Sequence, residues 1–594
     1  MTAALLTWAL LSADLRTPPV MVGVVLDDPS RRTRLSATHG IEALGGRIVH
    51  AFEDLLVAEV PRGTEFSIYR VEGVREVALN ALPRRRGPRS PGLSAWNAIA
   101  TIGRLAENTF GAEPLIRDAL IPPAVAPEGG TASVRAATGG TNLNTSEYLA
   151  GDISVTIVLP ESDGTSDTST ENWTADREAA VVAEIAEGLE WVRLREPQAA
   201  LAFRYTVIAG RTDVRARTRY EPIRRAADPG GTTGEDLWVK EVLGKLGHTT
   251  GDRFARSRAL AAARRAADGS DWGLNVFVVD SLNDADGKFA DGRFAYTWIG
   301  GPHVVMTFDN QAWGIDRLDM VFRHELFHAF YAFDEYAGSG CTCTEHRGYL
   351  DGLGANCTSC NASASPCVMI NNGDAMCTST RRQIGWADLD GDGVLDVVGE
   401  DPDTFLDAMA STWCSPPAVS GLAAVVAPTN RNPSTVTPRA SISINEIVGV
   451  DVRADGGAWV PAEVSGPLPA AQRRFSASVR DLAPGPHRLE ARAVDDRGNL
   501  DATPSAADVV VAAAARPLGD SIRGERTGTG LPRFTWTSVQ GAVGYRVLRA
   551  GSPQGTWSAA GETAEAAWID AAASDGYFVV RGIDACGVEG SDGP

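Results

Sequence analysis

Two histidines and a glutamate near the middle of this chain have the residue types and the spacing of a hydrolytic zinc site. Residues 324–336 read HELFHAFYAFDEY, so His324, Glu325 and His328 form an HExxH motif. On a helix, residues four positions apart share a face, and the two imidazoles can therefore bind one Zn²⁺. Glu325 is next to that face and can act as general base toward a zinc-bound water whose pKa the ion lowers. The motif predicts metal-assisted hydrolysis of a carbonyl compound.

The third metal ligand must come from the segment that follows this helix. On a straight helix Glu335 would lie about 16 Å from His324, at about 1.5 Å per residue, so the helix must end soon after His328. Asp334 follows His328 by six residues, which is the spacing of the third ligand in metzincin peptidases. A carboxylate oxygen is an acceptable zinc ligand. We expect Asp334 to be the third ligand, and Glu335 and His346 stay open as alternatives.

The helix that carries the motif needs a buried back face and a sheet to pack against. Residues 274–280 and 304–308 are short, β-branched apolar runs, which predict buried strands. Residues 175–194 and 253–267 have apolar positions three and four apart, which predicts two further helices. Together these elements indicate an α/β catalytic domain. The expected back face of the motif helix consists of Leu318, Val321, Phe322, Leu326, Phe330 and Phe333.

With these elements in place, residues from about 145 to 415 resemble secreted bacterial zinc metallopeptidases of the metzincin-like type. The resemblance rests on HELFHAFYAFDEY, the Phe294–Met306 block, the Pro366–Met369 turn, Glu171–Thr174 and Gln383–Trp386. The HExxH…DEY arrangement is also distantly similar to the IgA peptidase group. The resemblance implies a metzincin-like peptidase domain over residues 146–415, with an edge strand above its cleft and Met369 as the floor of the site. It does not say whether residues 294–301 hold the substrate or only complete the sheet.

Two residues depart from the metzincin pattern. Tyr331 stands where the pattern has the glycine that allows the chain to turn, and Asp334 stands where it has a third histidine. For the oxyanion of the reaction, Tyr336 and Tyr349 are candidate stabilising residues that the sequence does not separate.

An acidic loop downstream predicts a second metal site. Carboxylates occupy positions 1, 3, 5 and 9 of a calcium-loop pattern, and Gly393 at position 6 allows a sharp turn. Position 12 is Gly399 in place of the usual glutamate, so the loop is not a complete EF-hand and resembles the loops of dockerins and thrombospondin-type repeats. We expect structural Ca²⁺ here, and an ordinary turn at residues 283–287. The four expected calcium ligands are Asp388, Asp390, Asp392 and Asp396.

Charge and apolar runs limit the partners. The net charge of −20 over 594 residues argues against a nucleic-acid partner. No apolar run reaches the length of about 18 residues that a membrane span needs, so we expect none. A protein or glycoprotein is the expected substrate.

Cysteine placement favours an exported protein. Six of the eight cysteines lie between residues 341 and 377, in a loop rich in Gly, Ser and Asn. An even count in an exported enzyme predicts disulfides, with a structural zinc knot of Cys341, Cys343, Cys357 and Cys360 as the alternative. Together with the resemblance to secreted peptidases, these cysteines make the expected location extracellular.

The residues before the catalytic domain divide into three predicted parts. Residues 1–18 have the apolar core of a signal segment but lack its positive n-region. Residues 19–82 show a compact α+β pattern that resembles the ferredoxin-like propeptides of subtilisin-type proteases, which implies a domain that blocks the cleft until it is removed. Residues 83–145 are rich in Pro, Gly, Ala and Thr and predict a linker, with one helix near Ala95–Glu107.

After Cys414 the sequence changes to short strands and Gly/Pro turns, which is typical of all-β modules. Residues 416–513 resemble an Ig-like sandwich and residues 514–594 a fibronectin type III sandwich. Neither carries a catalytic constellation, so we expect spacing or attachment to a cell surface or glycan. The sequence thus predicts a secreted zinc endopeptidase in which Glu325 activates water. The alternatives are an inactive, zinc-containing adhesion or glycan-binding protein, and a zinc hydrolase of non-peptide amides or esters.

Overall fold

The structure is a computed structural model that describes most of the chain in two units. The first unit is Met1–Glu400 with Val426–Asn445, and the second is Asp401–Val425 with Glu446–Pro594. The expected division between residues 415 and 416 therefore lies elsewhere: the first strand of the second unit is Asp403–Leu406, and segment Val426–Asn445 belongs to the first unit. The described residues are 18–82, 90–109, 141, 143–227, 234–311, 313–414, 417–433, 440–466, 470–573 and 575–591.

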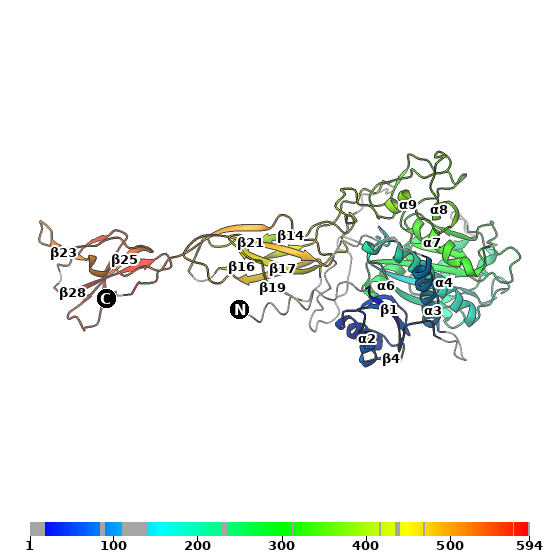
Figure 1. The fold of residues 1–594 in the computed structure, drawn as a ribbon, viewed down its shortest axis with the longest axis horizontal. Coiled ribbons are helices and arrows are strands. Elements are labelled where there is room, and N and C mark those ends of the chain that lie inside the picture. The colour runs from blue at the N-terminus through cyan, green and yellow to red at the C-terminus, as the bar shows by residue number, and fades with distance from the viewer. Residues whose placement is uncertain are drawn as a thin grey trace. The chain divides into compact units, whose positions relative to one another are not determined.

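A nine-stranded sheet of order β10-β11-β9-β5-β7-β2-β3-β1-β4 forms the centre of the first unit (Figure 1). The strands from β11 to β2 pair in parallel, whereas β10 is antiparallel to β11. The strands β2, β3, β1 and β4 pair antiparallel with one another. The bounds are β1 (Val20–Leu26), β2 (Arg47–Ala51), β3 (Leu55–Val60), β4 (Val74–Ala78), β5 (Asp152–Leu159), β7 (Ala202–Ala209), β9 (Trp272–Val279), β10 (Ala295–Thr297) and β11 (His303–Thr307).

Helices cover both faces of the central strands, as the apolar character of those strands requires. Every residue of β5 and β9 is buried, which is typical of parallel strands between two helical layers. Along β9, Val276 and Val278 pack into one core, and Phe277 and Val279 into a second. The first core contains residues of α3, α4 and α7, and the second contains residues of α5 and α6. These helices are α3 (Pro91–Thr109), α4 (Ala175–Arg195), α5 (Glu235–Lys245), α6 (Arg253–Asp268) and α7 (Leu318–Ala329).

The sequence predicted these elements to within a few residues. The expected helices at 175–194 and 253–267 are α4 and α6, and the expected strands at 274–280 and 304–308 are β9 and β11. Shorter elements complete the unit: α2 (Arg31–Ala43), α8 (Val368–Asn371), α9 (Thr378–Gln383), β6 (Glu161–Ser162), β8 (Arg217–Thr218), β12 (His346–Arg347), β13 (Gly352–Leu353), η1 (Ser67–Arg70), η2 (Pro197–Ala199), η3 (Val214–Ala216), η4 (Pro222–Arg224) and η5 (Ile315–Arg317).

The N-terminal strands belong to the nine-stranded sheet and not to a separate domain. Their order, β2-β3-β1-β4, is that of a ferredoxin-like sheet, with α2 on one face and the single turn η1 in place of a second helix. However, β2 pairs in parallel with β7, with His50 opposite Phe203. The other face of these strands packs under α3, where a Cβ atom on Gly23 would lie 2.6 Å from the ring of Trp96. The expected propeptide at 19–82 is thus one end of the main sheet.

The expected linker is also more structured than its composition indicates. The helix foreseen near Ala95–Glu107 is α3, and its residues Ala95, Trp96 and Ile99 are buried in the main core. Residues 83–89 and 110–140, and the expected signal segment apart from residue 18, lie outside the described residues.

The second unit consists of two β-sandwich modules. In the first, the sheets β14-β16-β20-β19 and β15-β22-β21-β17-β18 enclose one core. In the second, the sheets β23-β24-β27 and β26-β25-β28 enclose another. A disulfide between Cys414 and Cys586 links the two modules covalently. The bounds are β14 (Asp403–Leu406), β15 (Thr412–Trp413), β16 (Ala418–Ala424), β17 (Ile447–Ala454), β18 (Val460–Pro461), β19 (Glu463–Val464), β20 (Gln472–Ser478), β21 (Gly485–Asp495), β22 (Ser505–Val511), η6 (Gly519–Ser521), β23 (Arg523–Arg526), β24 (Pro532–Thr535), β25 (Ala542–Ala550), β26 (Ser558–Thr563), β27 (Ala567–Ile569) and β28 (Tyr577–Asp584).

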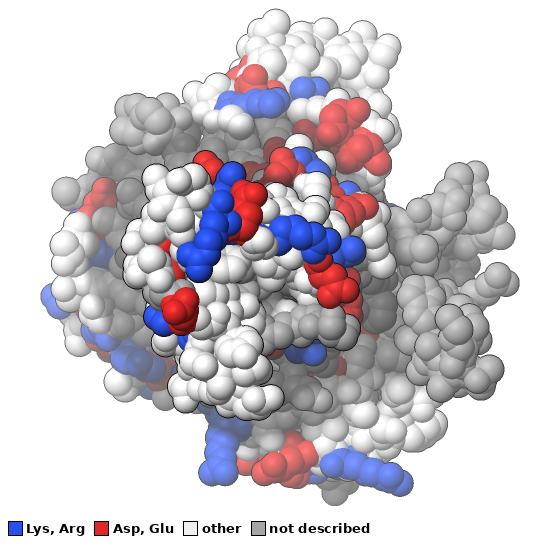
Figure 2. Space-filling view, turned by 90° about the vertical axis from the view of Figure 1, so that its left-hand side faces the viewer, with Lys and Arg blue, Asp and Glu red and all other residues white. Residues whose placement is uncertain are grey.

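Charges of both signs are mixed on the surface. On the face drawn in Figure 2, Lys and Arg side chains lie beside Asp and Glu side chains. In the last module, for example, Arg546 pairs with Glu562 at 2.6 Å and Arg581 pairs with Glu589 at 3.0 Å. Within the described part of the chain, no helix combines the length and the apolar character needed to cross a bilayer.

Candidate metal centre and cleft

Helix α7 carries the HExxH motif and ends directly after it. The backbone of Tyr331 has φ +77°, a left-handed conformation that L side chains rarely adopt, at the position where the metzincin pattern has glycine. The N–H of Tyr331 donates to the carbonyl of His328 at 3.0 Å, and the N–H of Ala332 donates to the carbonyl of Phe327 at 2.9 Å. These bonds close the helix and turn the chain back toward the two histidines.

Three side chains converge at this turn. The Nε2 atoms of His324 and His328 lie 3.1 Å apart, and Oδ1 of Asp334 lies 2.9 Å from the first and 3.4 Å from the second. Ligands about 2.0–2.1 Å from one tetrahedral Zn²⁺ would lie about 3.3 Å from each other, so the observed spacing fits such an ion.

Each imidazole is oriented by a carbonyl oxygen on its far side. The Nδ1 of His324 donates to the carbonyl of Val368 at 3.1 Å, and the Nδ1 of His328 donates to that of Ala332 at 2.8 Å. A carbonyl oxygen can only accept, so each Nδ1 carries the hydrogen and each Nε2 is left to bind a cation. The residues present therefore fit a zinc ion in both ligand type and orientation.

The charges at the site favour a cation among these groups. Although burial opposes its protonation, the hydrogen bond with Asp334 and the charge of Glu325 raise the pKa of His328 to about 9. Burial acts to raise the pKa of Asp334, but hydrogen bonds from His324 and His328 hold it far below its usual range. A metal ion would compete with protons for the same lone pairs, so its binding must release protons.

Glu325 lies beside the three converging groups with part of its carboxylate free. Burial raises the pKa of its carboxyl group. Its Oε2 atom has no hydrogen-bond partner among the residues that the structure describes. A buried carboxylate with an unused oxygen next to a candidate metal centre is suited to accept a proton from water.

The site opens into a cleft of about 650 Å³ between α7 and the strand β10. In the described sheet β10 is an edge strand, since β11 is its one neighbour. The edge strand that the resemblance implied is therefore present beside the motif helix. The cleft is lined by Arg293, Phe294, Ala295, Tyr296, Thr297, Trp298, Trp313, Val321, His324, Glu325, His328, Asp334, Tyr336, Ile370, Asn371 and Asn372.

The alternatives for the third ligand lie elsewhere. Glu335 is fully buried and points away from the histidines, with its carboxylate accepting from Asn356 at 2.7 Å and from Thr380 at 3.4 Å. His346 is exposed, and its Nδ1 lies 3.1 Å from the carbonyl of Asp351. Of the three candidates, only Asp334 reaches the histidines.

The two candidate tyrosines also differ in position. Tyr349 is fully buried and donates its hydroxyl hydrogen to the carbonyl of Pro428 at 2.7 Å, outside the cleft. Tyr336 lines the cleft and is 41% exposed. Its pKa is raised, mainly by partial burial and also by the negative charges of Asp334 and Glu325. Tyr336 is thus the tyrosine that can reach a bound substrate.

The segment expected as the floor of the site lies against the motif. Met369 is fully buried, and its carbonyl accepts from the N–H of Glu335 at 2.9 Å. The preceding carbonyl, of Val368, is the partner of His324. This segment thus contacts the motif and the residue after Asp334 through the carbonyl oxygens of Val368 and Met369, which residue types alone do not reveal.

The four cysteines of the alternative structural zinc site form two disulfides. Cys341 is bonded to Cys357 and Cys343 to Cys360, so the knot is excluded for this cluster. Cys367 and Cys377 are buried and unbonded.

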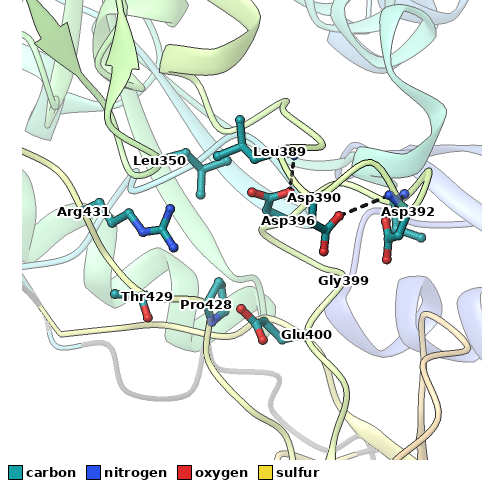
Figure 3. Close-up of a pocket in the computed structure, with 11 residues that line it drawn as sticks. Leu350, Leu389, Asp390, Asp392, Asp396, Gly399, Glu400, Pro428, Thr429 and Arg431 are labelled. Carbon is teal, nitrogen blue, oxygen red and sulfur yellow. Dashed lines mark hydrogen bonds between the residues drawn. The ribbon is translucent and has the colours of Figure 1, made fainter. Parts of the chain in front are cut away.

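The acidic loop brings three of its four expected ligands together. Oxygens of Asp388, Asp390 and Asp392 lie within 4.8 Å of one another, and all three residues are exposed. Asp396 is not part of this group. Its carboxylate instead accepts from the N–H of Leu389 at 2.8 Å (Figure 3). Segment 426–445, which we expected in a β module, belongs to the first unit and adds Arg431 to the pocket that Asp390, Asp392 and Asp396 line.

Comparisons with known proteins identify no family for this chain. No protein-family model and no curated protein match it. Similar solved structures include a segment of titin, with 15% identity over 33% of this chain and a TM-score of 0.21. The chicken CNTN1 FN1–FN3 domains have 10% identity over 32% of this chain and a TM-score of 0.18. The sulfane dehydrogenase SoxCD from Paracoccus pantotrophus has 22% identity over 24% and a TM-score of 0.13. The matched regions span 64%, 66% and 32% of those chains, respectively, and the TM-scores are too low to carry an argument.

Proposed function

We propose that this chain is a secreted, zinc-dependent endopeptidase of metzincin-like type. The observation that carries the proposal is the convergence of His324, His328 and Asp334 within hydrogen-bonding distance, beside a buried Glu325 and at the wall of an open cleft. Histidine and carboxylate ligands with an adjacent glutamate are the components of hydrolytic zinc sites.

Each residue of the site has a distinct part in the proposed reaction. Zn²⁺ held by the two imidazoles and Asp334 would acidify water and polarise the scissile carbonyl group. Glu325 accepts the proton of the attacking water and returns it to the leaving amine. Val368 and Ala332 keep the imidazoles in the binding tautomer through their carbonyl oxygens. Tyr336 is placed to donate a hydrogen bond to the developing oxyanion.

The shape of the cleft supports an extended peptide as substrate. Residues 293–298 line one wall continuously, and the extended strand β10 (Ala295–Thr297) lies in the middle of that wall. A substrate backbone can pair with the free edge of β10, as in other cases of strand addition. A small amide or ester would need a closed pocket instead.

The alternative of an inactive adhesion or glycan-binding protein with structural zinc is less well supported. A structural site has four protein ligands and no need of a base, whereas three groups converge here beside Glu325. The role of the β-sandwich modules in attachment to a surface or glycan stays a proposal. Extracellular location is supported by the three disulfides.

We also propose that the acidic loop binds a structural Ca²⁺. Asp388, Asp390 and Asp392 supply the hard oxygen ligands that this ion prefers. Gln198 anchors the loop to the catalytic unit, since its amide bonds to Gly393 at 2.9 Å and to Leu395 at 3.1 Å. An ion here would stabilise the exit from the catalytic unit.

The test is zinc content and casein cleavage, measured side by side for the wild type and for Glu325→Ala. Zinc in both proteins, with cleavage reduced at least about 100-fold in the variant, would support the peptidase and the role of Glu325. Glu345→Ala, which removes a carboxylate paired with Arg347 outside the cleft, should behave as wild type. Zinc in all three with cleavage in none would favour the binding-protein alternative.

A further inference from the structure

Two unbonded cysteines lie directly behind the candidate metal centre. Cys367 and Cys377 are 0% and 6% exposed, and both face the buried carboxylate of Glu335, the residue after Asp334. The thiol of Cys377 donates to Glu335 at 3.0 Å. The sulfur of Cys367 accepts from the N–H of Cys377 at 3.3 Å. The proposed reaction uses neither sulfur atom.

The two sulfur atoms are close enough to react with each other. Both lie against the hydroxyl of Thr380, at 3.1 Å for Cys367 and 3.3 Å for Cys377. Together with the Glu335 oxygen they lie within 4.8 Å of one another. The segments that carry them are also held together, because the N–H of Val368 donates to the carbonyl of Ala375 at 2.7 Å. To reach the bond length of about 2.05 Å, the two sulfur atoms must approach each other by less than about 3 Å.

A buried metal ion is the competing explanation for such a cluster. Cysteine thiolates and a carboxylate can bind zinc. However, the carboxylate of Glu335 is already engaged by Asn356 at 2.7 Å and by Thr380 at 3.4 Å. The surrounding loops contain two formed disulfides, Cys341–Cys357 and Cys343–Cys360. In a chain that forms disulfides, two thiols in contact are more readily oxidised than metallated.

We propose that Cys367 and Cys377 are a redox modification site, at which oxidation by a small disulfide such as oxidised glutathione closes a fourth bridge behind the metal centre. The sulfur of Cys367 attacks one sulfur of the oxidant, which forms a mixed disulfide and releases one small thiol. The sulfur of Cys377 then attacks Cys367, which forms the internal bond and releases the second small thiol. Two electrons pass from the cysteines to the oxidant, and their two protons end on the released thiols.

The local environment suits this order of attack. A hydrogen bond from Cys377 lowers the pKa of the Cys367 thiol, and the sulfur of Cys367, with burial, raises the pKa of Cys377. Cys367 is thus the better first nucleophile. The loop between the two cysteines includes the exposed residues Asn371 and Asp374, so its opening would admit a small oxidant.

The bridge would restrain the backbone that orients the metal ligands. Val368 follows Cys367 directly and its carbonyl holds the imidazole of His324. The carbonyl of Met369 accepts a hydrogen bond from the N–H of Glu335, the residue after Asp334. Loss of a group that orients a metal ligand typically lowers metal affinity by about 10–100-fold. We therefore expect the oxidised protein to retain zinc about tenfold better than the reduced protein, and this consequence rests on the proposed function.

The first test maps thiols and needs neither zinc nor activity. The full chain is equilibrated at graded ratios of oxidised to reduced glutathione, unfolded, and alkylated, and its peptides are identified by mass spectrometry. A bond between Cys367 and Cys377 that appears as the ratio rises is the expected result. Alkylation of both cysteines at every ratio would overturn the proposal. The proposal would also be overturned if the wild type bound a second equivalent of zinc that the variant Cys367→Ser/Cys377→Ser did not bind. The cluster would then be a metal site.

The second test measures zinc retention against a competing chelator before and after oxidation. The wild type should respond about tenfold, and Cys367→Ser/Cys377→Ser should not respond. The matched control Cys343→Ser/Cys360→Ser removes a neighbouring bridge and should respond as the wild type does. Equal retention in oxidised and reduced wild type would overturn the link to the metal centre. If no zinc binds at all, the proposed function fails while the thiol map still decides the bridge.

Discussion

The Oδ1 atom of Asp334 lies 2.9 Å from the Nε2 atom of His324, although the two residues are ten positions apart in the sequence. This contact depends on the turn at Tyr331, where the backbone takes a positive φ without glycine. The ring of Tyr331 is buried, and a Cβ atom on Gly300 would come within 2.7 Å of it. Packing of a large side chain thus stabilises a turn that other sequences form with glycine.

Asp334 is expected to be essential for metal binding. Asp334→Ala removes one of three converging ligands and should weaken zinc binding by more than about 100-fold, with parallel loss of cleavage. Zinc titration against a chelator measures this. His346→Ala is the matched control, since His346 is exposed and paired with Asp351, and it should leave zinc binding unchanged. If His346→Ala released the metal instead, our assignment of the third ligand would be wrong.

The N-terminal residues are expected to be required for folding and not to inhibit the enzyme. A chain that begins at residue 90 would lack Val25, Val49, Leu55 and Val57, which pack in the main core. It would therefore expose the apolar residues that they cover, and it should be insoluble. By contrast, a proteolytic cut within residues 83–89 should leave both fragments associated in gel filtration. A soluble, more active fragment that lacks residues 19–82 would restore the propeptide interpretation.

The stability of the first unit is expected to fall as pH rises above 5, in part through two glutamates of α4. Burial and the charge of Asp319 raise the pKa of Glu184 to about 8 and that of Glu187 to about 7, from an ordinary value of 4.5. At a pH between the ordinary pKa of 4.5 and these raised pKa values, the two glutamates hold protons in the folded protein that they have lost in the unfolded chain. This contribution is therefore complete below the unfolded pKa and is lost as pH rises through the folded values.

A variant that cannot ionise tests the sign of this effect. Glu184→Gln should raise Tm by a few degrees at pH 8 and change it little at pH 5. Glu53→Gln, at an exposed position, should shift Tm at neither pH. A Glu184→Gln protein that is less stable at pH 8 than wild type would contradict the assignment.

Calcium is expected to stabilise the protein through the acidic loop. Addition of Ca²⁺ to zinc-loaded, calcium-free protein should raise Tm, because an ion that binds only the folded state shifts the equilibrium toward it. Asp388→Asn/Asp390→Asn should abolish the response. Asp284→Asn/Asp286→Asn is the control, since Asp284 accepts the N–H groups of Asp286 and Gly287 in an ordinary turn. If Ca²⁺ does not change the Tm of the wild type, the proposed calcium site is wrong.

Many helices and strands of the first unit could be predicted because their sequence signals are local. Helix geometry alone places His324 and His328 on one face, and apolar runs identified the strands β9 and β11. The first N-terminal strand contained a further signal that our sequence analysis did not use. Val20–Leu26 is apolar at every position, which indicates a strand covered on both faces and therefore a second layer beyond α2.

The sequence by itself determined which chemistry is available: two imidazoles and a glutamate at helical spacing, and aspartates at calcium-loop spacing. Only the tertiary structure decided between Asp334 and Glu335, because adjacent residues point in different directions and the turn at Tyr331 sets which one faces the histidines. It also decided the cysteine pairs and the attachment of the N-terminal strands to β7. Spacing along the chain follows from local backbone geometry, whereas these contacts depend on which distant surfaces are buried together.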